Sequence, residues 1–124
     1  MKRLALILSL FTVHFVVAGA WALDTAAISN NVDTIVAGID NGQDITTFKS
    51  DAYEPYAFIM EEQGKMLVHP TLIGKSLKET APPVYDALMQ ASPEGTWVKY
   101  EWQGKEKNTY AKRTKSNLIV GSGY

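Results

Sequence analysis

The stretch Tyr56–Leu77 reads YAFIMEEQGKMLVHPTLIGKSL, and it decides the fold that we expect. Two apolar runs flank a polar break that contains Gly64. Glycine adopts the positive φ of a tight turn at almost no cost. We therefore predict two antiparallel strands, Tyr56–Glu61 and Lys65–His69, the second of which ends because Pro70 lacks a backbone donor.

Both faces of this predicted hairpin are apolar. Side chains alternate along a strand, so Tyr56, Phe58 and Met60 share one face of the first strand. Ala57 and Ile59 share the other face. A strand that is apolar on both faces is covered on both sides. We expect a helix to cover one face and the wall of a pocket to lie on the other.

The length and the N-terminal segment predict one small exported domain. The chain has 124 residues, which suits a single domain. Residues 1–22 have a basic start, an apolar stretch and the small-x-small sequence Ala20-Trp21-Ala22, which together resemble a cleaved signal peptide. A membrane helix needs about 20 apolar residues, and this run is shorter. We predict a signal peptide over 1–22, a domain over 23–124 and a periplasmic or secreted location; an uncleaved anchor is the alternative.

Charge and composition exclude several classes of function. Removal of residues 1–22 takes away Lys2 and Arg3 and no acidic residue, so the formal net charge changes from −1 to −3. A protein that is not basic is a poor partner for nucleic acid. Cysteine is absent and His69 is the single histidine after residue 22, which excludes a Cys–His pair and a multi-histidine metal site. We expect no enzyme, no cofactor and no metal.

Asp24–Ile39 is predicted to form an amphipathic helix. Asp24 is a candidate N-cap, and Asn41-Gly42 is a stop signal. The apolar residues recur on one stripe at helical spacing: Ile28, Val32, Ile35, Val36 and Ile39. We expect this stripe to pack on the sheet. The alternative is a helix that binds a partner or forms a homodimer.

The rest of the chain predicts a loop, a short helix and three more strands. Thr71–Pro83 is expected to be a loop, and Pro83 can open a short helix. A polar turn is expected at Gln103–Lys107. The predicted strands are Thr96–Trp102, Asn108–Arg113 and Leu118–Tyr124. Strands joined by short turns are antiparallel, so a five-stranded sheet with helices on it, an α+β architecture, is expected.

The last strand carries two glycines, Gly121 and Gly123. Glycine inside a strand lets another group approach the backbone closely, and it also favours a bend. We therefore expect either a ligand or a helix close to this strand, or a bend in the sheet.

Five short segments carry a resemblance to a known family. They are GKMLVHP at Gly64–Pro70, LIGKSL at Leu72–Leu77, GTWVKYEW at Gly95–Trp102, YAK at Tyr110–Lys112 and VGSGY at Val120–Tyr124. Their order and spacing, over about Asp24 to Tyr124, resemble the single Cache domain of bacterial extracytoplasmic sensors. The resemblance implies a PAS-like fold, with a long N-terminal helix on a five-stranded antiparallel sheet, and binding of a small organic molecule, often a small carboxylate.

The resemblance also implies a role in signalling. Receptors of this family continue into a second membrane helix and a cytoplasmic kinase, methyl-accepting or cyclase module. This chain ends at Tyr124, so we expect a free periplasmic domain that binds a ligand and acts with a separate membrane receptor or kinase. The alternative is a scaffold that binds no ligand and associates with another periplasmic or membrane protein.

The family's pocket lies on the sheet face away from the long helix. The residues expected around it combine aromatic rings with polar edges: Tyr56, Phe58, His69, Tyr100, Trp102, Tyr110 and Lys112. Lys112 would pair with a ligand carboxylate. His69 would donate a hydrogen bond, or change charge near its usual pKa of about 6.5. The alternatives are core packing for Phe58 and Trp102, a solvated Lys112, and a His69 that is satisfied locally.

Overall fold

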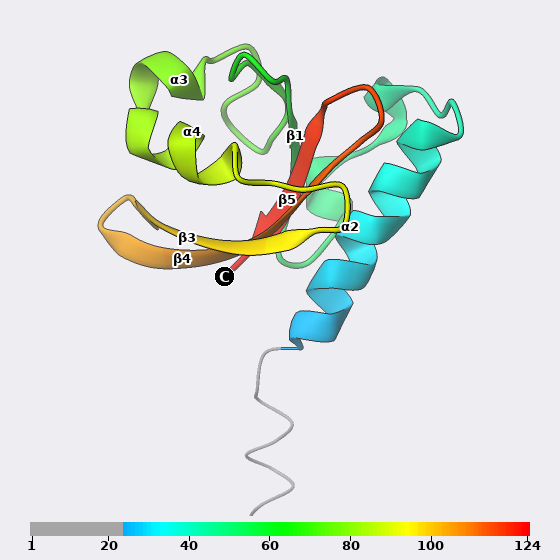
Figure 1. The fold of residues 1–124 in the computed structure, drawn as a ribbon, viewed down its shortest axis with the longest axis horizontal. Coiled ribbons are helices and arrows are strands. Elements are labelled where there is room, and N and C mark those ends of the chain that lie inside the picture. Colours follow the sequence, from blue (N-terminus) through cyan, green and yellow to red (C-terminus); the bar gives the residue numbers. More distant parts are fainter. Residues whose placement is uncertain (1–23) are drawn as a thin grey trace, which may run out of the picture.

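The computed structural model describes residues 24–124, and the predicted signal peptide lies outside them. In this part of the chain, helix α2 (Thr25–Asp40) lies on one side of an antiparallel sheet, and the short helices α3 (Leu77–Thr80) and α4 (Pro82–Leu88) lie on the other (Figure 1). No helix of residues 24–124 has the length and the apolar composition to cross a membrane.

The sheet has five strands in the order β2-β1-β5-β4-β3. Their bounds are Ala57–Met60 for β1, Met66–Val68 for β2, Thr96–Trp102 for β3, Lys105–Arg113 for β4 and Ile119–Gly123 for β5. Every neighbouring pair is antiparallel. The predicted hairpin, the three-stranded meander and the α+β architecture are therefore confirmed, and β5 pairs with β1 to join the two parts.

Helix α2 forms as its sequence predicts. The carboxylate of Asp24 accepts from the backbone N–H of Ala27 at 3.1 Å and caps the first turn. Asn41 closes the other end. Four members of the apolar stripe are buried against the sheet: Ile28, Val32, Ile35 and Val36. The prediction that the stripe packs on the sheet is confirmed, so a homodimer through α2 would have to use its polar face.

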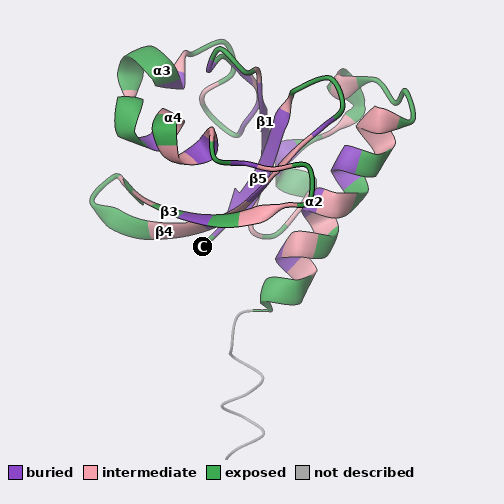
Figure 2. Ribbon diagram, in the orientation of Figure 1, coloured by how far each residue is buried: buried purple, intermediate pink, exposed green. Residues whose placement is uncertain are grey.

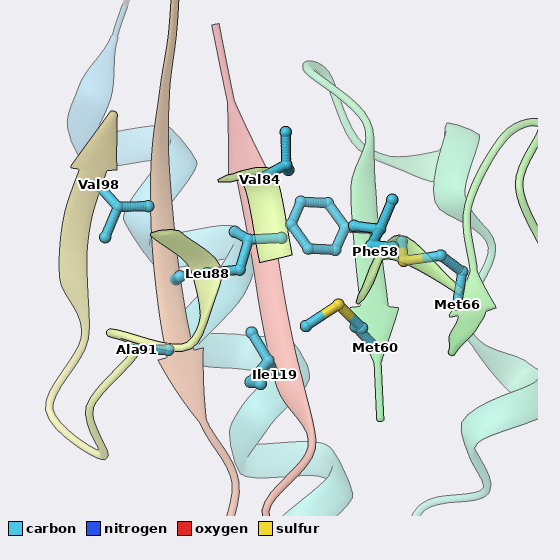
Figure 3. Packing of buried hydrophobic residues seen from close by; sticks show 10 residues of the cluster. Phe58, Met60, Met66, Val84, Leu88, Ala91, Val98 and Ile119 are labelled. Carbon is cyan, nitrogen blue, oxygen red and sulfur yellow. The ribbon is translucent and has the colours of Figure 1, made fainter. Parts of the chain in front are cut away.

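The other face of the sheet is covered as well, because all four residues of β1 and all five of β5 are buried (Figure 2). Phe58 and Met60 pack with Val84 and Leu88 of α4 (Figure 3). Ala57 and Ile59, on the opposite face of β1, pack in a separate buried cluster with residues of the apolar stripe of α2. The prediction that both faces of the hairpin are covered is confirmed.

The prediction of a continuous loop over Thr71–Pro83 is wrong, because α3 forms inside it and α4 begins at Pro82. Ser76 caps α3, and its hydroxyl accepts from the backbone N–H of Glu79 at 3.4 Å. The spacing Ser-x-x-Glu is the sequence signature of such a cap.

The turn between β3 and β4 also differs from the prediction. It contains two residues, Gln103 and Gly104, with φ of 52° and 82°, so β4 begins at Lys105 and the predicted turn Gln103–Lys107 is wrong. Two positive φ angles are typical of the tight type I′ hairpin turn. The short turn fixes the register, in which Tyr100 lies opposite Lys107. Register decides which residues of β4 face which side of the sheet.

Candidate functional site

A small cavity lies on the side of the sheet away from α2. Strands β1, β2 and β3, helices α3 and α4 and the loop after β2 supply its walls, which are Tyr56, Phe58, Met66, His69, Leu72, Leu77, Val84, Leu88, Tyr100 and Trp102. Its free volume is about 20 Å³, which is enough for about one water molecule. The protein's own side chains therefore nearly fill the cavity.

The structure brings five of the seven predicted site residues together at this cavity: Tyr56, Phe58, His69, Tyr100 and Trp102. They meet because alternation places Tyr100 and Trp102 on the same face of β3, and this face looks toward the same layer as Phe58 on β1. The ring centroids of Tyr56 and His69 are 5.2 Å apart, in an edge-to-face arrangement.

Tyr110 and Lys112 lie on the opposite face of the sheet, so the expectation that all seven residues surround one pocket is not met. The hydroxyl of Tyr110 donates to Asp33 of α2 at 3.2 Å. The Nζ of Lys112 lies 3.0 Å from the same carboxylate oxygen. Burial, and then the charge of Asp33, raise the pKa of Tyr110 above its ordinary value. These contacts attach α2 to β4.

Lys107 is the cation that the structure places beside the cavity, and the sequence reasoning missed it. Its Nζ lies 4.7 Å from the centroid of the Tyr56 ring and 3.4 Å from the Tyr56 hydroxyl oxygen. Neither of the two ion pairs found in residues 24–124 involves Lys107. The sequence signal for this placement is the two-residue turn at Gln103-Gly104. Such a turn sets Lys107 opposite Tyr100, so that Lys107, rather than Lys112, lies on the same face of the sheet as Tyr100.

His69 is held as a neutral hydrogen-bond donor. Its Nδ1 accepts from the backbone N–H groups of Thr71 and Leu72 at 3.0 and 3.1 Å, so the ring proton lies on Nε2. Burial, reinforced by the charge of Lys107, lowers the pKa of His69 from 6.5 to about 4. No described residue accepts a hydrogen bond from Nε2, which leaves this N–H for another acceptor. The Nδ1 bonds also hold the loop that carries Leu72.

The two tyrosines of the cavity are fixed by β4 and β5. The hydroxyl of Tyr100 lies 2.9 Å from the hydroxyl of Thr109, and burial raises the pKa of Tyr100 to about 12. The hydroxyl of Ser122, which is fully buried, lies 3.0 Å from the carbonyl of Tyr56 and positions the start of β1. These contacts hold the hydroxyl of Tyr100 and the backbone of Tyr56 in place.

Two wider depressions lie elsewhere on the surface. One, of about 450 Å³, is bounded by Phe48, Leu67 and Ile73. The other, of about 470 Å³, lies beside α2, where Asp33 and Lys112 meet. His69 also lines the first depression, so this side chain borders both that depression and the small cavity. Within residues 24–124, no group of three or more His, Cys, Asp and Glu side chains is arranged to hold a metal.

No protein-family model and no curated protein matches the chain. One similar solved structure is a methyl-accepting chemotaxis protein from Vibrio parahaemolyticus RIMD 2210633, at 21% identity and a TM-score of 0.47, covering 73% of this chain and 78% of that one. Another is the ligand-binding domain of the Pseudomonas fluorescens chemoreceptor CtaA in complex with L-alanine, at 30% identity and a TM-score of 0.38. That match covers 55% of this chain and 31% of the CtaA chain. The geometry of the cavity, rather than these similarities, carries the functional proposal.

Proposed function

We propose that this chain is an extracytoplasmic, single Cache-type domain that binds a small organic molecule, a small carboxylate, for signal transduction or solute sensing. The supporting observation is that Tyr56 and His69 line one largely apolar cavity and that a cation, Lys107, lies against Tyr56, with its Nζ 3.4 Å from the Tyr56 hydroxyl oxygen. Ligand sites of small molecules are mostly apolar, with a few polar groups that fix orientation. A cation and neutral donors together suit a carboxylate.

The proposal includes export and a partner. Residues 1–22 act as a cleaved signal peptide, and the domain over 23–124 works in the periplasm or outside the cell. The domain presents its ligand, or its ligand-bound form, to a membrane receptor or kinase. A homodimer through the polar face of α2 is compatible with this role, and no catalytic activity is proposed.

A second candidate function is a scaffold that binds no small molecule and associates with another periplasmic or membrane protein. The observation that favours it is the free volume of about 20 Å³, because side chains nearly fill the cavity. Ligand binding requires the cover, formed by residues 70–88, to move outward. The two functions therefore differ in whether this cover opens.

A thermal-shift screen against small carboxylates, amino acids, amines and neutral compounds tests the proposal. A ligand present at about 100 times its dissociation constant stabilises the folded protein by about 2.7 kcal/mol, which raises the melting temperature measurably. We expect at least one compound to do so. A screen in which no compound raises the melting temperature would reject ligand binding and leave the scaffold.

A further inference from the structure

We propose that the free edge of β3 is a dimer interface, at which two copies of this chain pair antiparallel and join their sheets across a two-fold axis. The interface uses the backbone edge of β3 and the exposed side chains beside it, and it needs no ligand. The supporting observations are the unpaired backbone of β3, the charges along its exposed face and the register that two-fold symmetry allows.

The two edges of the sheet differ in how the chain covers them. At the β2 edge the backbone of Met66 is engaged, because its N–H donates to the carbonyl of Lys75 at 2.9 Å and its carbonyl accepts from Gly74 at 2.8 Å. At the other edge β3 pairs with β4 alone (Figure 1). No backbone hydrogen bond from elsewhere in residues 24–124 reaches Lys99 or Glu101. A row of unpaired N–H and C=O groups is a template for a further strand.

The register between β3 and β4 decides which groups of β3 point outward. Asn108 of β4 exchanges backbone hydrogen bonds with Tyr124 at 2.7 and 2.9 Å, so its N–H and C=O point away from Lys99, which lies opposite it on β3. Hydrogen-bonded and non-bonded pairs alternate along an antiparallel ladder. Lys99 and Glu101 therefore both direct their backbone groups to the free edge, and both residues are exposed.

The charges beside this edge have no ionic partner within the described domain. Neither ion pair of residues 24–124 includes Lys99 or Glu101. Glu101 lies opposite Glu106 of β4, and like charges directly opposite each other across two strands are unfavourable. A lysine on the open side of Glu101 would offset this repulsion, and a second copy of β3 can supply it.

Two-fold symmetry leaves a choice of register, and the charges decide it. An antiparallel pairing centred on Tyr100 places Lys99 opposite Glu101 of the second copy, and Glu101 opposite its Lys99. Each of these pairs exchanges both backbone hydrogen bonds, because the backbone groups of both residues point outward. A pairing centred on Lys99 would instead set lysine against lysine. Charge complementarity therefore selects the register centred on Tyr100.

Trp97 adds apolar surface at each end of this interface. The residue is 42% exposed, and its ring centroid lies 5.5 Å from that of Tyr110 and 6.3 Å from that of Tyr124, so neighbouring rings support it. In the register centred on Tyr100, Trp97 lies opposite Gln103 of the second copy. Covering exposed aromatic surface favours association.

Sedimentation velocity over a range of concentrations tests the inference on the unmodified protein, and we expect a reversible equilibrium between monomer and dimer. Amide hydrogen exchange locates the interface. Exchange at Lys99 and Glu101 should slow as the dimer forms, whereas exchange at Tyr100, whose N–H already bonds to β4, should change less. A monomer at every concentration would overturn the inference and would make Lys99 a residue that protects the edge from pairing. Protection at the polar face of α2 instead of at β3 would also overturn it.

Charge exchange between Lys99 and Glu101 tests the register. Lys99→Glu and Glu101→Lys each replace both attractive pairs of the dimer by repulsive pairs, so each should raise the dissociation constant of the dimer by at least about 10-fold. The two changes combined in one chain restore opposite charges and should restore the dimer. Glu79→Lys, at an exposed position of α3, is the matched control for net charge and should change the dissociation constant little.

The variants also separate a lost interface from a lost fold. Glu101→Lys sets a lysine opposite Glu106 within the domain, so its melting temperature should not fall. An equimolar mixture of Lys99→Glu and Glu101→Lys should form a mixed dimer, since each chain supplies the charges that the other lacks. Failure of the combined variant to dimerise would overturn the register, and an equal weakening in Glu79→Lys would overturn the role of the β3 charges.

Discussion

Phe58 of β1 lies directly opposite Gly121 of β5, and the aromatic ring covers the glycine. A Cβ built on Gly121 would lie 2.4 Å from the tip of the ring, which is far inside contact distance. The two strand glycines were expected either to permit close approach of a ligand or a helix, or to mark a bend in the sheet. At Gly121 the group that approaches is instead a side chain from the neighbouring strand, and this side chain is a wall of the cavity.

Gly121→Ala should therefore displace the Phe58 ring, which is only 5% exposed. Overpacking of a filled core costs about 1–3 kcal/mol, and we expect a loss of that size in the free energy of unfolding by urea. In a Phe58→Leu background the added methyl group has more room, so the loss should be smaller. An equal loss in both backgrounds would show that the ring is not the obstacle.

Ile35→Asp should destabilise the domain by at least about 3 kcal/mol, because it buries a charge between α2 and the sheet. Ile35 is 1% exposed and packs in the cluster that contains Val120. Urea melts measure the change. Asn30→Asp, on the exposed face of the same helix, is the control and should change stability little. Similar melts for Ile35→Asp and the unchanged protein would place the stripe in solvent.

The stability of the domain should fall in acid because of His69. Its pKa is lowered from 6.5 to about 4 in the folded state, so between these values the unfolded chain binds the proton and the folded domain does not. The contribution of His69 to the free energy of unfolding is fully present above about pH 6.5. It is lost as the pH falls toward 4, and the total loss is at most about 3 kcal/mol.

His69→Asn isolates this effect, because the asparagine oxygen can still accept from the loop N–H groups and has no proton to gain. Urea midpoints measured from pH 7 to pH 4 should decline less steeply in His69→Asn. Parallel declines in the two proteins would assign the acid sensitivity to carboxylates instead.

Arg113→Lys should loosen the attachment of α4 to the sheet. The guanidinium donates to the carbonyls of Ala91 and Met89 at 3.1 and 3.0 Å and to the carboxylate of Glu62 at 3.3 Å. Lysine cannot reproduce this planar arrangement, so we expect a loss of about 1–3 kcal/mol in the free energy of unfolding. Glu62→Gln, which removes only the 48%-exposed partner, should cost at most about 1 kcal/mol. A larger cost for Glu62→Gln would make the ion pair the main contact.

The mature protein should begin at or near Leu23, because Ala20-Trp21-Ala22 has the form of a cleavage site. Mass spectrometry of a periplasmic extract measures the N-terminus. Detection of the bulk of the protein with Met1 or Lys2 at its start would indicate an uncleaved segment.

Much of the fold was predictable because its signals are local. The apolar stripe of α2 follows helical spacing over its whole length, and the Asp24 cap lies next to the helix that it starts. The hairpin of β1 and β2 needs only Gly64, with its φ of 106°, between two apolar runs. The capping box of α3 was also local, and it was missed because the helix contains only four residues.

The sequence by itself determined which residues share a strand face, while only the tertiary structure decided which side of the sheet each face looks toward. Alternation correctly paired Tyr100 with Trp102 and Tyr110 with Lys112, but it fixes faces within one strand only. The register across the two-residue turn at Gln103-Gly104 decided which residues of β4 share a sheet face with Tyr100 and Trp102 of β3. For that physical reason Lys107 lies against Tyr56 and Lys112 lies at Asp33. The free volume of the cavity likewise depends on side chains from distant segments that meet only in the folded domain.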